Sequence, residues 1–109
     1  MRKRQLGSEG PEVSAIGLGC MGMTIQYGEL NDEQSIATIH HALDIGVDLI
    51  NSSDMYGFGK NEELIAKAIN DRRKEVILNT KFGQVRNPDG TGSVNGASAS
   101  ILIGAVVCC

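Results

Sequence analysis

Near the middle of the chain stands the stretch Val47-Asp48-Leu49-Ile50-Asn51-Ser52, a short segment rich in β-forming residues. A short apolar run that ends in polar residues is typical of a buried strand. Helical patterns flank it on both sides, and a further apolar run follows at Val76 to Thr80. The stretch therefore predicts a strand set between helices, with another strand beyond.

The segment before this strand carries the clearest helical pattern. From Asp32 to Ile45 the apolar residues recur at helical spacing, so they fall on one face. Asn31 is suited to cap the start, Gln34 completes a capping box, and Gly46 is suited to end the helix. The predicted apolar face consists of Ile36, Ile39, Ala42 and Leu43.

Further elements follow from the same patterns. Turn-forming residues between Arg4–Leu6 and Val13–Ser14 predict a short β-hairpin, and Ala15–Gly19 is expected to be the first strand of the main fold. After the central strand, a second amphipathic helix is marked by Leu64, Ile65, Ala68 and Ile69.

The order strand, helix, strand, helix, strand predicts an α/β fold with right-handed βαβ units and a parallel sheet. Ligands of such sheets bind at the carboxyl ends of the strands. We therefore expect the chemistry after Gly19, Ile50 and Thr80. The stretch Gly83–Gly96 is rich in Gly, Asn, Pro and Asp and predicts one long loop.

Composition excludes several classes of protein. The chain has 109 residues, 41% hydrophobic and 21% charged, which indicates one soluble globular domain at most. A net charge of −3 offers no basic face for a nucleic acid or an anionic membrane surface. No apolar run approaches the roughly 20 residues of a membrane span, and the basic start lacks the apolar core of an export signal. A cytoplasmic protein is expected.

The cysteines and histidines suggest alternatives that the pattern does not favour. Cys20 lies far from the adjacent Cys108 and Cys109, so reduced thiols are expected. A dicysteine end is similar to those of prenylated vesicle-traffic GTPases, although no other feature of that family occurs here. Adjacent His40 and His41 point in different directions on a helix, which favours solvated histidines over a metal site.

The glycines at positions 17, 19 and 22 fit G-x-G-x-x-G by spacing and open a dinucleotide-binding alternative. That fingerprint also needs an acidic residue about 20 positions further on, after a second strand. No acidic residue is clearly placed there. A Rossmann site is therefore not favoured.

Three blocks resemble one known family. The run Asn51-Ser52-Ser53-Asp54-Met55-Tyr56-Gly57, with Asn61-Glu62-Glu63-Leu64 after it, looks like the active-site signature of the aldo-keto reductases. The segment Val13–Met23 resembles their opening strand and loop, and Thr80-Lys81-Phe82-Gly83 resembles their third block. The loop around Asn87-Pro88-Asp89-Gly90 is most similar to the branch that contains auxin-induced-type reductases.

The resemblance implies a fold larger than this chain. The family has a (β/α)8 TIM barrel, and such barrels need about 250 residues. Residues 1–96 are therefore expected to form its N-terminal part, a leading β-hairpin and about three βα units. Residues 97–109 are apolar, carry no charge and look unrelated to the family, as in a truncated or frameshifted gene product.

The resemblance also implies a chemistry. Family members use NADPH to reduce aldehydes and ketones, small-molecule carbonyl substrates, to alcohols. Tyr56 stands at the position of the proton-donating tyrosine, Lys81 at that of the lysine beside it, and Asn51 at that of the catalytic aspartate. Met21, Gly22 and Asn51 are the expected cofactor-side positions. The family histidine comes from the next strand, beyond this chain.

Two further readings remain open. The chain is expected to be inactive alone, as a catalytically silent fragment whose uncovered sheet edges favour self-association. The other reading is a non-enzymatic interaction or regulatory module built on a reductase barrel. Binding of NADPH and turnover of a carbonyl would separate an enzyme from both.

Overall fold

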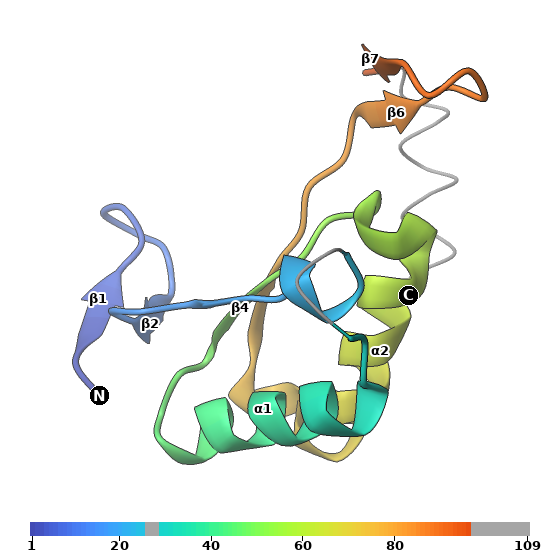
Figure 1. Ribbon diagram of the computed structural model, residues 1–109. Helices are drawn as coiled ribbons and strands as arrows, with labels where there is room; N and C mark the ends of the chain where they lie inside the picture. Colours follow the sequence, from blue (N-terminus) through green and yellow to red (C-terminus); the bar gives the residue numbers. More distant parts are fainter. Residues whose placement is uncertain (26–28, 97–109) are drawn as a thin grey trace.

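The computed structural model describes residues 1–25 and 29–96, and Figure 1 shows how they are arranged. A three-stranded sheet and two α-helices form the body. One β-hairpin precedes the strands of this sheet in the sequence, and a second β-hairpin follows them. The elements are β1 Lys3–Gln5, β2 Glu12–Ser14, β3 Leu18–Gly19, η1 Met21–Met23, α1 Asp32–Asp44, β4 Leu49–Asn51, η2 Tyr56–Gly59, α2 Lys60–Ile69, η3 Asn70–Glu75, β5 Ile77–Asn79, β6 Gln84–Arg86 and β7 Gly92–Val94.

The central sheet has the order β3-β4-β5, and both pairs of strands are parallel. This confirms the βαβ order expected from the sequence. Ile50 in the middle strand is fully buried against the helices, whereas its neighbours Leu49 and Asn51 point to the other face. The core cluster comprises Cys20, Ile39, Leu43, Ile50, Ile65, Ala68, Ile69 and Val76.

The ends of α1 confirm the predicted caps. The Asn31 side chain accepts a hydrogen bond of 2.9 Å from the Gln34 backbone N–H. At the other end Gly46 has φ +89°, a left-handed conformation that a side chain would strain. Gly46 N–H donates to the carbonyl of Leu43, and Val47 N–H to that of Ala42, which is the Schellman arrangement.

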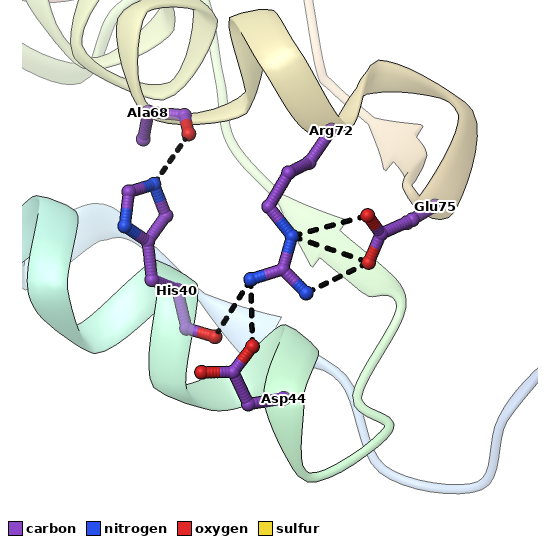
Figure 2. Close-up of polar contacts among 5 residues, drawn as sticks. All are labelled: His40, Asp44, Ala68, Arg72 and Glu75. Atoms are coloured by element: carbon purple, nitrogen blue, oxygen red, sulfur yellow. Dashed lines mark hydrogen bonds and ion pairs between the residues drawn. The ribbon is translucent and has the colours of Figure 1, made fainter.

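Polar contacts fasten α1 to α2 and η3, as Figure 2 shows. His40 Nε2 donates to the Ala68 carbonyl at 2.7 Å, so this half-buried histidine bridges two helices. The expectation of solvated histidines therefore holds for the exposed His41 and only in part for His40. Arg72 donates to Asp44 at 2.7 Å and to Glu75 at 2.7 Å. The hydrogen bonds that Arg72 donates to Glu75 and Asp44 raise the pKa of Arg72, and its guanidinium lowers the pKa of Glu75.

The predicted first hairpin is confirmed, with β1 and β2 antiparallel. It is fastened to the start of β4 through Asp48, whose carboxylate pairs with Lys3 and accepts a hydrogen bond of 2.6 Å from Ser14 N–H. Ser14 Oγ in turn accepts from the backbone N–H of Asp48 at 3.1 Å. Partial burial works to raise the pKa of Asp48, but the hydrogen bonds from Lys3 and Ser14 outweigh it and hold that pKa below its ordinary value.

The first strand of the sheet is shorter than expected. Ala15–Gly19 was predicted to be a strand, but only Leu18 and Gly19 pair with β4. Ala15 N–H still bonds to Arg2 in the hairpin, and Ile16 is 64% exposed, because the chain crosses here from one sheet to the next. Tertiary pairing of Ala15 thus overrides the local apolar pattern.

The stretch Gly83–Gly96 is a second hairpin, and the prediction of one long loop is wrong. β6 and β7 pair antiparallel, with Gln84 opposite Val94. Asp89 Oδ1 accepts hydrogen bonds from the backbone N–H and hydroxyl of Thr91 at 2.9 and 2.6 Å, and Gly90 has φ +86°. The Asn-Pro-Asp-Gly sequence is therefore a tight turn between strands.

The predicted apolar tail at 97–109, with Cys108 and Cys109, lies outside the described residues. Among the helices of the described ranges, none combines the length and the apolar character that crossing a membrane requires.

Candidate active site

The carboxyl ends of the three parallel strands meet at one edge of the sheet. Backbone hydrogen bonds join the segments that follow them: Cys20 N–H donates to the Asn51 carbonyl at 3.0 Å, Ser52 N–H to that of Asn79 at 2.8 Å, and Asp54 N–H to that of Lys81 at 3.1 Å. The three places where the sequence predicted chemistry are thus brought together.

Lys81 lies at the centre of this edge. Its Nζ donates to Asn51 Oδ1 at 2.7 Å and to the Ser52 carbonyl at 2.5 Å. The same nitrogen lies 4.8 Å from the centroid of the Tyr56 ring, a cation–π distance. Of the residues predicted for the site, Lys81 therefore contacts both Asn51 and Tyr56.

The loop that carries Tyr56 has an unusual backbone. Gly57 and Phe58 both adopt left-handed conformations, with φ of 59° and 54°. A Cβ at Gly57 would lie 3.1 Å from the Thr24 side chain, so the loop packs closely against the segment after β3. Phe58 tolerates its conformation at a cost of about 1 kcal/mol and leaves 77% of its surface exposed.

Asn61 joins the loops behind the site and is fully buried. Its Nδ2 donates to the Cys20 carbonyl at 2.7 Å and to Thr24 Oγ1 at 2.9 Å, and its Oδ1 accepts from Ser52 Oγ at 2.6 Å. We call these four residues the Asn61 hub. The sequence marked Asn61 only as part of a motif, and its role as a link between loops was missed because the contacts cross from one strand end to another.

Asn79 is a second residue that sequence reasoning missed. It is the register partner of Asn51 in the adjacent strand, and its Oδ1 accepts a hydrogen bond from Asn51 Nδ2. The signal was available in principle, because parallel strands of known register place such residues side by side.

Met21 and Gly22, the predicted cofactor-side residues, form the 3-10 turn η1 directly after β3. The turn is held near Asn51 by the Cys20 backbone hydrogen bond. Cys20 itself is buried and unpaired, and burial raises the pKa of its thiol to about 11, so it is an unreactive packing residue. Across residues 1–25 and 29–96, no group of three potential metal ligands is assembled.

Comparison with known proteins identifies the family. The family model of the aldo/keto reductases matches residues 15–102, which is most of the chain. The chain belongs to the aldo/keto reductase family. The resemblance that the three sequence blocks suggested is confirmed.

One relative of the chain is the aldo-keto reductase yakc of Schizosaccharomyces pombe, which is named as an NADP(+) protein. The two are 46% identical over 94 residues, which cover 84% of this chain. They cover 27% of the relative, so the chain spans about a quarter of its length.

Solved reductases share the fold. The holo form of the aldo-keto reductase AKR11C1 from Bacillus halodurans has a TM-score of 0.80 at 27% identity, covering 99% of this chain and 36% of that one. The aldo-keto reductase from Klebsiella pneumoniae in complex with NADPH has a TM-score of 0.59 at 33% identity, covering 75% and 28%. These matches confirm the predicted fold, the N-terminal part of a (β/α)8 TIM barrel.

Proposed function

We propose that this reductase chain supplies the proton-donating part of a site that reduces aldehydes or ketones to alcohols with NADPH. The observation that carries the proposal is the placement of Lys81 Nζ, 4.8 Å from the Tyr56 ring centroid and hydrogen-bonded to Asn51. Tyr56 is the acid, Lys81 is the cation beside it, and Asn51 holds Lys81.

The proposed roles follow from acid–base chemistry. A free tyrosine has a pKa of about 10, so a phenol gives up its proton near neutral pH only when the phenolate is stabilised. A nearby ammonium stabilises that phenolate. The backbone of Ser52 and the amide of Asn51 hold the Lys81 ammonium over the Tyr56 ring, which keeps a positive charge close to the group that would become a phenolate.

The residues on the cofactor side fit the nicotinamide end of NADPH. The 3-10 turn of Met21 and Gly22 and the Asn51 side chain lie at the same edge as Tyr56, so these residues would hold the nicotinamide end beside the acid. When bound, NADPH supplies the hydride for the carbonyl carbon. Support comes from the yakc relative, named as an NADP(+) protein, and from the Klebsiella pneumoniae reductase solved with NADPH.

Asn51 departs from the family pattern, in which this position is an aspartate. An asparagine oxygen accepts a hydrogen bond from Lys81 but does not neutralise its charge. Asn51 therefore favours a slower reductase, or a catalytically silent member of the family whose 109 residues are inactive alone. The second reading includes a regulatory or interaction module and self-association through uncovered sheet edges.

The proposal includes the domain limits and the location. Residues 1–96 are taken as the reductase part and residues 97–109 as an unrelated apolar tail, in a cytoplasmic protein that acts on a small carbonyl compound. Because the chain spans 27% of its yakc relative, activity is proposed for these residues in the setting of a whole barrel.

A titration with NADPH, followed by cofactor fluorescence, tests the proposal. One sample is the 109-residue chain, and the other replaces residues 97–109 with a family-like continuation that completes the barrel. Binding and carbonyl turnover by the completed barrel, with turnover lost in its Tyr56→Phe variant, are expected. A completed barrel that folds but does not bind NADPH, or a Tyr56→Phe variant with full turnover, contradicts the proposal.

A further inference from the structure

Asn51 and Asn79 lie side by side on one face of the sheet. They are Cα partners in the parallel pair β4–β5. Ile50, next to Asn51, is buried against the helices, so strand alternation directs both asparagines to the opposite face. This is the face on which Lys81 contacts Asn51.

The contacts determine which way the Asn51 amide points. An ammonium has donors only, so Lys81 must take the Asn51 oxygen, at 2.7 Å from Nζ. The Asn51 nitrogen is then directed to its neighbour, where Asn79 Oδ1 accepts its hydrogen bond. The amide is thus held at both ends, by a donor on one side and an acceptor on the other.

An amide needs this second contact more than a carboxylate does. A carboxylate presents an acceptor oxygen to Lys81 whichever way it is turned, and its charge attracts the ammonium over a distance. An amide has a single acceptor and no charge. A hydrogen bond at its nitrogen fixes the amide plane and polarises the oxygen toward a better acceptor.

We propose that Asn79 is a positioning residue, which holds the Asn51 amide so that its oxygen keeps Lys81 over the Tyr56 ring. The role is conditional, because it exists only while position 51 is an asparagine. It rests on the proposed function of Tyr56 and Lys81, but it concerns their arrangement in the chain without cofactor.

Nuclear magnetic resonance of the 109-residue chain measures that arrangement directly. The Tyr56 ring current shifts the Lys81 Hε resonances upfield while the ammonium lies 4.8 Å from the ring centroid. The Lys81 signals are assigned by their disappearance in a Lys81→Arg variant. Asn79→Leu is compared in two backgrounds, the natural Asn51 and Asn51→Asp, with Asn70→Leu as a matched exposed asparagine away from the site.

The expected result is a loss of most of the upfield shift in Asn79→Leu with Asn51, and its retention in Asn79→Leu with Asn51→Asp and in Asn70→Leu. An equal loss in both backgrounds would show a merely structural role and overturn the inference. So would an unchanged shift in Asn79→Leu, or no shift in the parent chain. Amide spectra report folding, and Asn79→Ala replaces the leucine variant if that variant unfolds.

This experiment separates the inference from the proposed function. It needs neither NADPH nor turnover, so a chain that fails to bind the cofactor still reports the Lys81 shift. If the completed barrel binds NADPH but Asn79→Leu leaves the Lys81 shift unchanged, only the role of Asn79 is contradicted. If Asn79→Leu abolishes the shift only in the Asn51 background and the completed barrel does not bind NADPH, only the proposed reductase function is contradicted.

Discussion

At the scale of single residues, Asn51 governs how strongly Lys81 is held. The Lys81 ammonium already makes a charge-assisted hydrogen bond to Asn51, and Asn51→Asp in a completed barrel adds a charged acceptor, which contributes about 1 kcal/mol more. We expect kcat for carbonyl reduction to rise by about fivefold, since about 1.4 kcal/mol corresponds to a factor of ten and about 1 kcal/mol to a factor of about five. Steady-state kinetics with a common aldehyde measures this, and an unchanged or lower kcat contradicts it.

Replacement of Asn61 should lower the stability of the fold, because this side chain links the loops and does not take part in the proposed chemistry. Asn61→Leu keeps the branched shape of the side chain but leaves the Ser52 hydroxyl and the Cys20 carbonyl buried without their partner. Each buried polar group left unpaired costs about 1–3 kcal/mol. Urea unfolding followed by circular dichroism should show a loss of about 2–4 kcal/mol by the same reasoning. The exposed Asn70→Leu serves as control, and equal losses in the two variants contradict the role of the Asn61 hub.

At the scale of elements, Asp48 should make the first hairpin sensitive to acid. The folded-state pKa of Asp48 lies below the ordinary 3.8, so its contribution to stability is complete above that value. The contribution is lost as the pH falls through the folded-state pKa, because the protonated group no longer pairs with Lys3. The protection of the Ala15 and Leu6 amides against hydrogen exchange, relative to the intrinsic rate at each pH, should therefore fall below that pH.

Two variants complete this test. Asp48→Asn should show fast exchange in the first hairpin already at pH 6, with no further acid step. Asp89, whose pKa is also lowered, by hydrogen bonds from Thr91, lies in the second hairpin. Asp89→Asn should leave the acid step of Ala15 in place. An acid step that persists in Asp48→Asn would assign it to another group.

The polar contacts between α1 and η3 depend on the planar guanidinium of Arg72. Its guanidinium donates to Asp44 and Glu75 at once, and to the His40 carbonyl at 3.4 Å. Arg72→Lys keeps the charge but not the planar set of donors, so it should lower the thermal midpoint almost as much as Arg72→Met. Equal midpoints for Arg72→Lys and the parent chain would show that charge alone is sufficient.

At the scale of the whole molecule, apolar side chains remain uncovered in the described residues. Leu78 on β5 is 41% exposed although it is the register partner of the buried Ile50, and Phe82 is 61% exposed. An edge strand of this kind favours pairing with another chain. Sedimentation of the 109-residue chain should show association that grows with concentration and weakens in Leu78→Lys. A monomer at all concentrations would rule this out.

Much of this fold was predictable because its signals are local. The faces of α1 and α2, the Asn31 cap and the Gly46 turn each depend on residues within a few positions of one another, and all are confirmed. The limits of the first sheet strand were not predictable in this way, because Ala15 pairs with Arg2 in the hairpin and does not join the central sheet. The second hairpin was missed although Asp89 and Gly90 are typical turn residues, because its strands lack an apolar alternation.

In the candidate site, some residues could be found from the sequence and others only from the structure. The resemblance gave Asn51, Tyr56 and Lys81, and the structure places Lys81 in contact with the other two, although their catalytic roles stay predictions. Asn79 and the Asn61 hub could not be found without knowing which strand ends are neighbours. Register and burial, which arise only from the packed sheet, determine those contacts.

The Asn61 hub has a consequence for protein engineering. Loops at the mouth of a barrel are commonly exchanged one at a time to alter specificity, on the assumption that each is a separate cassette. Here the side chain at the start of α2 satisfies partners in two different loops, Thr24 in one and Ser52 in the other. A transplant of either loop into a barrel with another residue at position 61 would carry an unmatched polar group with it. The segment to transfer is therefore the pair of loops together with the first turn of α2.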